Sequence, residues 1–511
     1  MRRKITQSSA PERRDDPSAM DLGEFRRWLL LTLGLCLCNL PVLLGVYPGF
    51  FVYDAYEEWL QTATQTYNTH HPLLHVWLLG HVIELVHGWT DSYNAGICTW
   101  IVLQMLVING CFAYGVEFLR RHGAGRVFRG MVFLFFGFFP TIVMYTLCSC
   151  KDGLFSALLL LTVLFLYEEK RWPMVVSATF LLLLRHNGLY AWIVYILLVG
   201  IGICLTKCRK GDNAPARLET GVISANKGKF LLWLLLPVLC AVLINTGMTR
   251  LLHATGGEHQ EILTVPIQQL GRTYNAYPQE LSAAERETLF RYLPEEAFPH
   301  YTEKLSDPLK YFFINPAYEA DRWSFWQLWV QLGLRHPGSY LQAWLGTSRG
   351  FWDPWTIVDL YEGHAVFTIV YGGSSYFGYE TEEPGTRHSF LPFVDRVYRS
   401  LSLNPIWQKL PVIHLLLAPG FVFWFDLGCL VLLIMWCRRR PHAGGGSPDG
   451  SQQQLQHILL CALPVFLIWL TVLLGPGCLV RYVVYLWYLA PFAVYAVYRI
   501  NKSSSLLQID Q

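Results

Sequence analysis

Charged residues are scarce in this chain, which excludes an ordinary soluble globular protein. Only 15% of its 511 residues are Asp, Glu, Lys or Arg, and 53% are hydrophobic, whereas soluble domains carry about 25% charged residues. The hydrophobic residues form long runs, and a helix needs roughly 20 of them to cross a bilayer core. The net charge of +3 is too small to indicate a nucleic-acid partner. We therefore predict an integral membrane protein.

Cysteine, although present at 13 positions, gives no sign of a disulfide framework or a zinc site. Most of the cysteines lie inside apolar runs, where cysteine packs as a small hydrophobic residue. The segment 251–409 has no cysteine at all, so disulfides do not hold it together. No four-ligand zinc spacing occurs, and we expect neither a metal nor a cofactor.

About ten apolar runs predict an all-α polytopic protein. The first follows a polar, basic stretch and is not followed by a small-residue cleavage site, which favours a retained span over a removed signal peptide. Two of the runs, 153–167 and 173–184, are short. We expect spans near 28–46, 95–117, 127–147, 153–167, 173–184, 189–206, 230–249, 411–436, 457–475 and 482–498.

Lys and Arg are scarce in alternate short connections, and this asymmetry predicts the topology. No Lys or Arg occurs from Tyr47 to Gly96, and cytoplasmic loops are the ones enriched in these residues. The run 73–87 carries three histidines and Glu84. If it crossed the membrane, the later basic loops would lie outside, so we interpret it as an interfacial helix. Both termini are then cytoplasmic. The expected organisation is a basic tail (1–27), a membrane module (28–250) with a first outer loop (47–94), a large, mainly helical outer loop (251–409), C-terminal spans (410–498) and a cytoplasmic tail (499–511).

The first outer loop holds an acidic cluster that suits general-base chemistry. Asp54 and Glu58 are four residues apart, so a helix places both on one face, and one carboxylate can orient or tune another. The alternative is a solvated helix start with Asp54 near the N-cap. Glu57, His70 and His71 are further candidates for substrate contacts. Together with His75, these histidines could bind a phosphate or a metal, or they could instead face lipid headgroups.

Three isolated cations lie in outer turns, where the topology rule disfavours them: Lys151, Arg185 and Arg481. Each alone could extend to a lipid phosphate. Together they could converge on one anion, and arginine suits phosphate well. The natural candidate is a diphosphate or phosphodiester headgroup in the outer leaflet. Their neighbours are candidate substrate contacts: Asp152, Asn187 and Tyr482.

The large outer loop contributes polar and aromatic candidates. Gln268, Gln269 and Arg272 are spaced to share a helix face, where they could donate hydrogen bonds to a sugar or phosphate. The alternative is ordinary helix-surface polarity. Trp352 could stack on a sugar ring or lie at the membrane interface.

These motifs resemble the GT-C superfamily of polyprenyl-phosphate-sugar glycosyltransferases. Asp54 in YDAYEEW matches the position of that family's catalytic aspartate, and Lys151-Asp152 resembles a later acidic motif. HHPLLH, KDGLFS, RHNG, PIQQLGR and the Arg481-Tyr482 pair also resemble an uncharacterised bacterial family of GT-C-like membrane proteins. The resemblance implies a GT-C-like fold and sugar transfer. The absence of Asp-x-Asp from the first loop indicates a metal-independent reaction.

The leading hypothesis is therefore an inverting sugar transfer at the extracytoplasmic face, from a polyprenyl-phosphate donor to a glycan, lipid or protein acceptor. Asp54 would be the base, supported by Glu58, and the three cations would stabilise the leaving group. The alternative is a transporter, flippase or polymerase of lipid-linked glycans, and a third is a non-catalytic glycan-binding factor. The outer loops contain no Asn-x-Ser/Thr sequon, which favours a bacterial plasma membrane.

Overall fold

The computed structural model describes residues 21–208, 227–357, 381–404, 406–439 and 450–509. Within these ranges the regular structure is helical, with isolated β-bridges and no β-strand. The prediction of an all-α protein is therefore confirmed.

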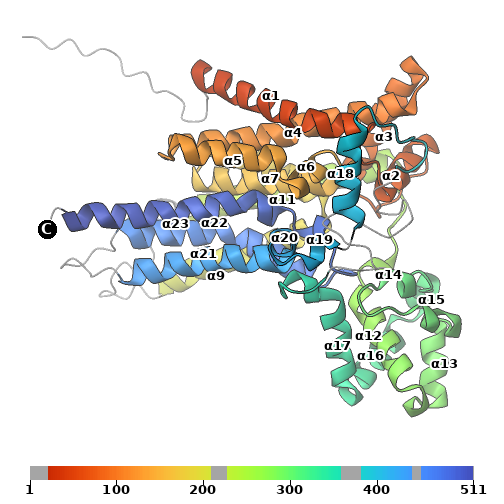
Figure 1. The fold of residues 1–511 in the computed structure, drawn as a ribbon. Helices are drawn as coiled ribbons and strands as arrows, with labels where there is room; N and C mark the ends of the chain where they lie inside the picture. Colours follow the sequence, from red (N-terminus) through yellow and green to blue (C-terminus); the bar gives the residue numbers. More distant parts are fainter. Residues whose placement is uncertain (1–20, 209–226, 358–380, 405, 440–449, 510–511) are drawn as a thin grey trace, which may run out of the picture.

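The long helices of the bundle run roughly parallel to one another, with the C-terminus at one end (Figure 1). They are α1 (Leu22–Gly45), α4 (Tyr93–Arg121), α5 (Arg126–Phe138), α7 (Lys151–Tyr167), α8 (Arg171–Leu184), α9 (His186–Cys208), α11 (Lys227–Leu251), α21 (Pro419–Arg439), α22 (Gly450–Val472) and α23 (Tyr485–Ile509). Two short helices, α6 (Pro140–Thr146) and α20 (Pro411–Leu417), adjoin them.

Seven of the described helices are long and apolar enough to cross a membrane, and the bent pair α5–α6 would make eight. The chain is therefore a multi-pass membrane protein. Helix α8 is apolar but has only 14 residues, and α7 has 17. Helices cover all ten expected segments, and the count of ten spans stays a prediction.

Two expected spans are broken where a proline follows an extended residue. Helices α5 and α6 meet at an angle of 58°, because Phe139 is extended and Pro140 lacks the N–H that would continue the ladder. In the same way Ala418 is extended before Pro419, so α21 begins there. Helices thus occupy both expected spans, 127–147 and 411–436, but each contains a break that a hydropathy pattern does not register.

The connections that carry polar motifs lie at the end of the bundle away from the C-terminus (Figure 1). Helices α2 (Tyr53–Ala63) and α3 (Leu73–Thr90) belong to the expected first outer loop. They pack so closely that a Cβ on Gly80 would lie 2.1 Å from Thr62 Oγ1. Although α3 has 18 residues, it is not among the helices apolar enough to span. This fits the interfacial interpretation of 73–87.

The large loop forms a small helical domain with its own core at the same end (Figure 1). Apolar side chains such as Ile267, Leu289 and Phe325 are fully buried in it. Its longer helices are α12 (Thr264–Ala276), α13 (Ala283–Tyr292), α16 (Arg322–Arg335) and α17 (Pro337–Ser348), and its short ones are α14 (Asp307–Lys310) and α15 (Asn315–Ala320). Two more, α18 (Pro392–Leu403) and α19 (Ile406–Lys409), lead back to the bundle.

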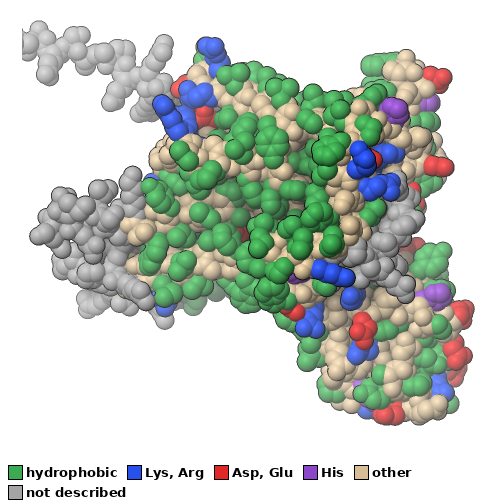
Figure 2. Space-filling model, viewed as in Figure 1, with side chains coloured by type: hydrophobic (Ala, Val, Ile, Leu, Met, Phe, Trp, Pro, Cys, Tyr) green, Lys and Arg blue, Asp and Glu red, His purple; other side chains and the backbone are tan. Residues whose placement is uncertain are grey.

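The surface of the molecule separates by residue type. Figure 2 shows hydrophobic side chains over the flank of the bundle and charged ones at its ends and on the loop domain. A bilayer requires this arrangement, because charged groups are costly in the hydrocarbon region.

Candidate functional site

The turn between α6 and α7 fixes the start of the first outer loop. Phe50 N donates to Leu147 O at 3.0 Å, and Ser149 N donates to Phe50 O at 2.9 Å. The Ser149 hydroxyl is fully buried; it donates to Phe50 O and accepts from Val52 N. These bonds place the first turn of α2 beside the first residue of α7, which is Lys151.

Asp54 lies in that first turn and forms two buried ion pairs. Its Oδ2 atom accepts from Arg481 Nη1 at 2.7 Å and from Lys151 Nζ at 3.2 Å. Arg481 belongs to the short 3-10 helix η5 (Val480–Val483) before α23. The N-cap of α2 is Val52, so Asp54 lies near the cap as the alternative interpretation required, but it is buried and not solvated.

Glu58 lies on the same face of α2 and also faces Lys151, as the four-residue spacing predicts. The ammonium donates to Glu58 Oε1 at 3.4 Å and to His71 Nδ1 at 3.3 Å. Lys151 therefore bridges two carboxylates and an imidazole. Asp54, Glu58 and His71 are buried, and 13% of the Lys151 side chain is exposed.

The remaining Glu58 oxygen forms a short hydrogen bond with His75 Nδ1. His75 is 1% exposed, and its ring meets the edge of Trp100 at 5.2 Å between centroids. Its other ring nitrogen, Nε2, is buried with no hydrogen-bond partner among the described residues. The sequence analysis considered His75 only as a possible phosphate or metal contact and did not predict its contact with Glu58. His71 precedes the N-cap Pro72 of α3, so no helical spacing links it to His75.

Burial and charge act in opposite directions on the two carboxylates. Burial alone would raise the pKa of Asp54, but the charges of Arg481 and Lys151 hold that pKa well below its ordinary range. For Glu58, His75 and Lys151 likewise outweigh burial and lower the pKa to about 2. Burial and the Lys151 charge lower the pKa of His71 to about 3. At neutral pH both carboxylates are thus ionised, and His71 is a neutral acceptor for Lys151.

Arg185 forms a second pair beside the first. It lies between α8 and α9 with an extended backbone, and its Nη1 atom donates to Asp152 Oδ1. The other oxygen of Asp152 is buried without a hydrogen-bond partner among the described residues. The guanidinium lies 4.6 Å from the Tyr482 ring centroid, and that of Arg481 lies 5.1 Å from the same centroid. Tyr482 therefore contacts both arginines and links the two pairs.

The other predicted residues of this end occupy supporting or peripheral positions. Asn187 donates to the Thr471 hydroxyl at 3.0 Å, next to Arg185 in the chain. His70 is exposed, with its ring against that of His71. Glu57 is half-buried and faces Tyr53, whose pKa is raised to about 12 by burial and then by the Glu57 charge.

The predicted residues of the large loop contribute to its own structure. Gln268 donates to Thr302 O at 2.6 Å, and Gln269 donates to Tyr340 O at 3.3 Å. Both side chains are buried, so the alternative of ordinary helix-surface polarity does not describe them. Arg272 pairs with Glu303 at 2.9 Å.

Trp352 packs partly buried against the main core, and its carbonyl accepts from Trp424. The structure does not bring these four residues into contact with the Asp54 cluster.

The cluster that is assembled joins residues far apart in the chain around buried carboxylates. Within the part of the chain that the structure describes, no group of three or more His, Cys, Asp or Glu is placed to hold a metal. The Lys151 ammonium lies instead between the two carboxylates.

Comparison with known proteins identifies one family. A family model described as "Family of unknown function (DUF6020)" matches residues 47–443, a range that contains Asp54, Glu58, His71, Lys151 and Arg185. Arg481 lies beyond it. No curated protein and no solved structure matches the chain.

Proposed function

We propose, from the premise that the chain belongs to this family of unknown function, that it is a membrane glycosyltransferase. In this proposal it moves a sugar from a polyprenyl-phosphate donor to an acceptor hydroxyl at the loop-bearing end of the bundle. One observation carries the proposal: Asp54 is paired to both Lys151 and Arg481, although 427 residues separate Asp54 from Arg481.

The cluster is an expensive way to stabilise a fold, which favours a functional role. Removing charges from water costs several kcal/mol per ion, and replacing a buried ion pair by apolar residues is often neutral or stabilising. Strongly shifted pKa values of polar groups at a membrane boundary are typical of functional sites. Here the buried ion pairs and the shifted pKa values both occur where the first turns of α2 and α7 meet the short helix η5, which carries Arg481.

The pairing supplies a way to switch Asp54 between resting and reactive states. While Lys151 and Arg481 neutralise it, its pKa stays well below the ordinary range and it is a weak base. A donor phosphate would compete for the same two cations, as arginine and lysine both bind phosphate. Once Lys151 and Arg481 pair with the phosphate instead, burial raises the pKa of Asp54, and Asp54 becomes a stronger base. The donor would thereby activate the base that its own transfer needs.

The reaction is then one displacement at the anomeric carbon. The acceptor hydroxyl gives its proton to Asp54, and its oxygen forms a bond to the anomeric carbon. The bond from that carbon to the phosphate oxygen breaks, and the electron pair leaves with the phosphate. Lys151, Arg481 and, beside them, Arg185 stabilise this developing charge. A single displacement inverts the anomeric configuration.

Glu58, His71 and His75 act as positioning residues in this scheme. Glu58 and His71 hold the Lys151 ammonium, and His75 holds Glu58 from behind. The ammonium is thereby fixed on rigid helices, as pre-organised electrostatic stabilisation requires.

The direct test uses the full-length protein in proteoliposomes with labelled polyprenyl-phosphate sugars. Asp54→Asn keeps the shape and removes the base, so we expect transfer to fall by about 10²–10⁴-fold. The matched control is Glu319→Gln, a carboxylate on the loop domain that is 58% exposed, and it should leave the rate unchanged. Undiminished transfer by Asp54→Asn would remove Asp54 from the chemistry.

The transporter, flippase or polymerase alternative has one observation in its favour. Transporters build binding sites at interrupted helices, and α8 ends at Leu184 immediately before Arg185 and the start of α9. The same proteoliposomes separate the two functions. Movement of the lipid-linked sugar across the bilayer without a covalent product would support transport. Binding without flux or product would support the glycan-binding factor.

A further inference from the structure

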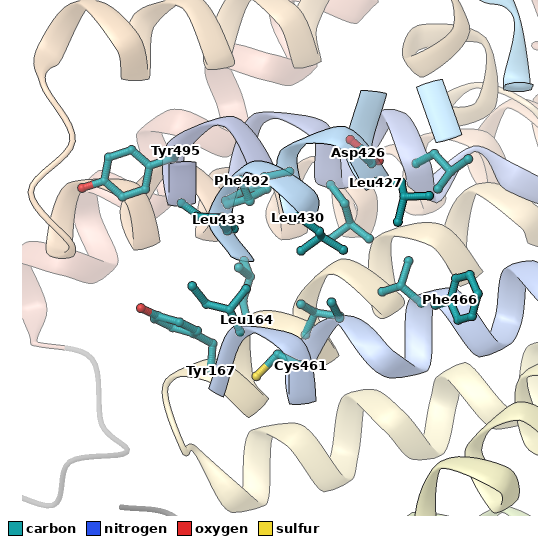
Figure 3. Close-up of a pocket in the computed structure, with 18 of the residues that line it drawn as sticks. Leu164, Tyr167, Asp426, Leu427, Leu430, Leu433, Cys461, Phe466, Phe492 and Tyr495 are labelled. Atoms are coloured by element: carbon teal, nitrogen blue, oxygen red, sulfur yellow. The ribbon is translucent and has the colours of Figure 1, made fainter. Parts of the chain in front are cut away.

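An apolar groove runs along the bundle towards the end that carries the C-terminus. Helices α7, α21, α22 and α23 enclose a groove of about 180 Å³. Its walls are almost entirely apolar and include Leu164, Leu430 and Phe492 (Figure 3). In Figure 3, Tyr167 and Tyr495 lie at one end and Asp426 and Phe466 at the other.

The groove is long enough to hold a lipid chain. Its lining along α23 extends from Leu486 to Arg499, and at about 1.5 Å per residue this is roughly 20 Å. One leaflet of a bilayer has a hydrocarbon depth of roughly 15 Å, half of the whole core. The groove therefore runs deeper than a single leaflet.

The two ends of the groove differ in charge. At the end near the C-terminus, Arg499 contributes a guanidinium whose Nη1 atom donates to the Tyr167 hydroxyl at 3.3 Å. His122 lines the same end, and burial lowers its pKa, so the positive charge there belongs to Arg499. At the other end one carboxyl oxygen of Asp426 is buried without a hydrogen-bond partner among the described residues. An anionic headgroup is therefore attracted to the end that carries Arg499.

We propose that this groove binds an anionic phospholipid of the cytoplasmic leaflet, with its phosphate at Arg499 and one acyl chain along α23. The occupant is distinct from the donor of the proposed reaction, because a donor phosphate seated at Arg499 would lie at the opposite end of the bundle from Asp54. The inference does not depend on the glycosyltransferase proposal. It rests on an apolar groove of leaflet length with a cation at one end and a carboxyl at the other.

Photo-crosslinking of the full-length protein in nanodiscs tests this site. The bilayer is phosphatidylcholine with a small fraction of phosphatidylglycerol that carries a diazirine in one acyl chain. We expect adducts on groove residues such as Leu430 and Leu433, mapped by mass spectrometry. Arg499→Gln should lower this labelling about fivefold, the effect of one cation near a charged lipid surface. The matched control is Arg438→Gln, which removes an exposed cation near the end of α21. It should leave the labelling unchanged.

A second variant tests the space itself. Ala493→Trp fills the groove from α23 and should abolish labelling; if it does not fold, the Arg499→Gln and Arg438→Gln pair still decides. Equal labelling by phosphatidylcholine and phosphatidylglycerol probes, unaffected by Arg499→Gln, would overturn the proposal. Preferential labelling by a diazirine-bearing polyprenyl phosphate would also overturn it and assign the groove to the donor.

Discussion

The Nζ atom of Lys151 lies 3.2 Å from Asp54 Oδ2, although 97 residues separate the two in the chain. Lys151 is the first residue of α7, and Asp54 is the second of α2. Their contact joins the expected first outer loop to the membrane bundle. It also places an ammonium beside both carboxylates of α2, so Lys151 is the residue on which the geometry of the cluster most depends.

Replacing Lys151 by Met is expected to destabilise the protein strongly. The substitution leaves Asp54 and Glu58 buried with one cation fewer, and loss of one partner of a buried pair costs about 3–5 kcal/mol. Thermal unfolding in detergent measures the loss. Lys310→Met is the control, since Lys310 is itself buried and pairs with the exposed Glu261 and with Asp307 in the loop domain. It should also destabilise but leave sugar transfer by the folded fraction intact, whereas Lys151→Met should abolish transfer. Equal transfer by both variants would contradict the role of Lys151.

The stability of the protein should fall as the pH falls below about 6.5. The pKa of His71 is lowered from 6.5 to about 3, and that of Glu58 from 4.5 to about 2. In each case the unfolded chain takes up the proton first, so the native state loses stability as the pH falls through the window between the two values. Asp54, whose pKa is also lowered, acts in the same direction.

His71→Gln separates these contributions. It should weaken the pH dependence between 6.5 and 4.5, where Glu58 has yet to contribute, and leave the loss that Glu58 and Asp54 cause at lower pH. Melting temperatures across this range in detergent provide the measurement. An unchanged profile would mean that His71 does not remain neutral in the folded protein.

Ser149→Ala should reduce transfer while the protein still folds. The Ser149 hydroxyl bonds to Phe50 O and Val52 N, and loss of two hydrogen bonds costs about 1–3 kcal/mol. The start of α2 would shift and displace Asp54, so we expect the effect mainly on kcat. Ser156→Ala, which removes only a bond to Asp152 O within α7, is the control with little expected effect. Equal effects of the two variants would argue against a positioning role for Ser149.

Gly80→Ala should force α2 and α3 apart. A Cβ there would lie 2.1 Å from Thr62 Oγ1, and overpacking of this kind costs about 1–3 kcal/mol. The Glu58–His75 contact joins the same two helices, so transfer should fall as well. At Gly88, where a Cβ would meet nothing within 4 Å, the same substitution should be tolerated. Wild-type stability of Gly80→Ala would show that the helices can separate without cost.

The convergence of Asp54, Lys151 and Arg481 was predictable because charge is costly at a membrane boundary. An isolated cation in an outer turn contradicts the usual distribution of charge, and such exceptions point to a common partner. The all-α architecture follows from hydropathy in the same way. Both arguments use properties that depend on residue type and position alone.

Other features depended on tertiary packing and were missed. His75 lies in an apolar run, and only the close contact of α2 and α3 shows that it reaches Glu58. Gln268 and Gln269 were expected to contact a ligand, but both are buried and donate to backbone carbonyls of the loop domain itself. The break at Pro140 was invisible to a hydropathy window.

The most direct test of the account is a structure of the full-length protein bound to a polyprenyl phosphate in a lipid nanodisc. The account predicts that the phosphate contacts Lys151 and Arg481, and that the Arg481–Asp54 distance increases beyond 2.7 Å as the carboxylate is released. A phosphate bound elsewhere, with the contacts of Asp54 to both cations intact, would contradict it.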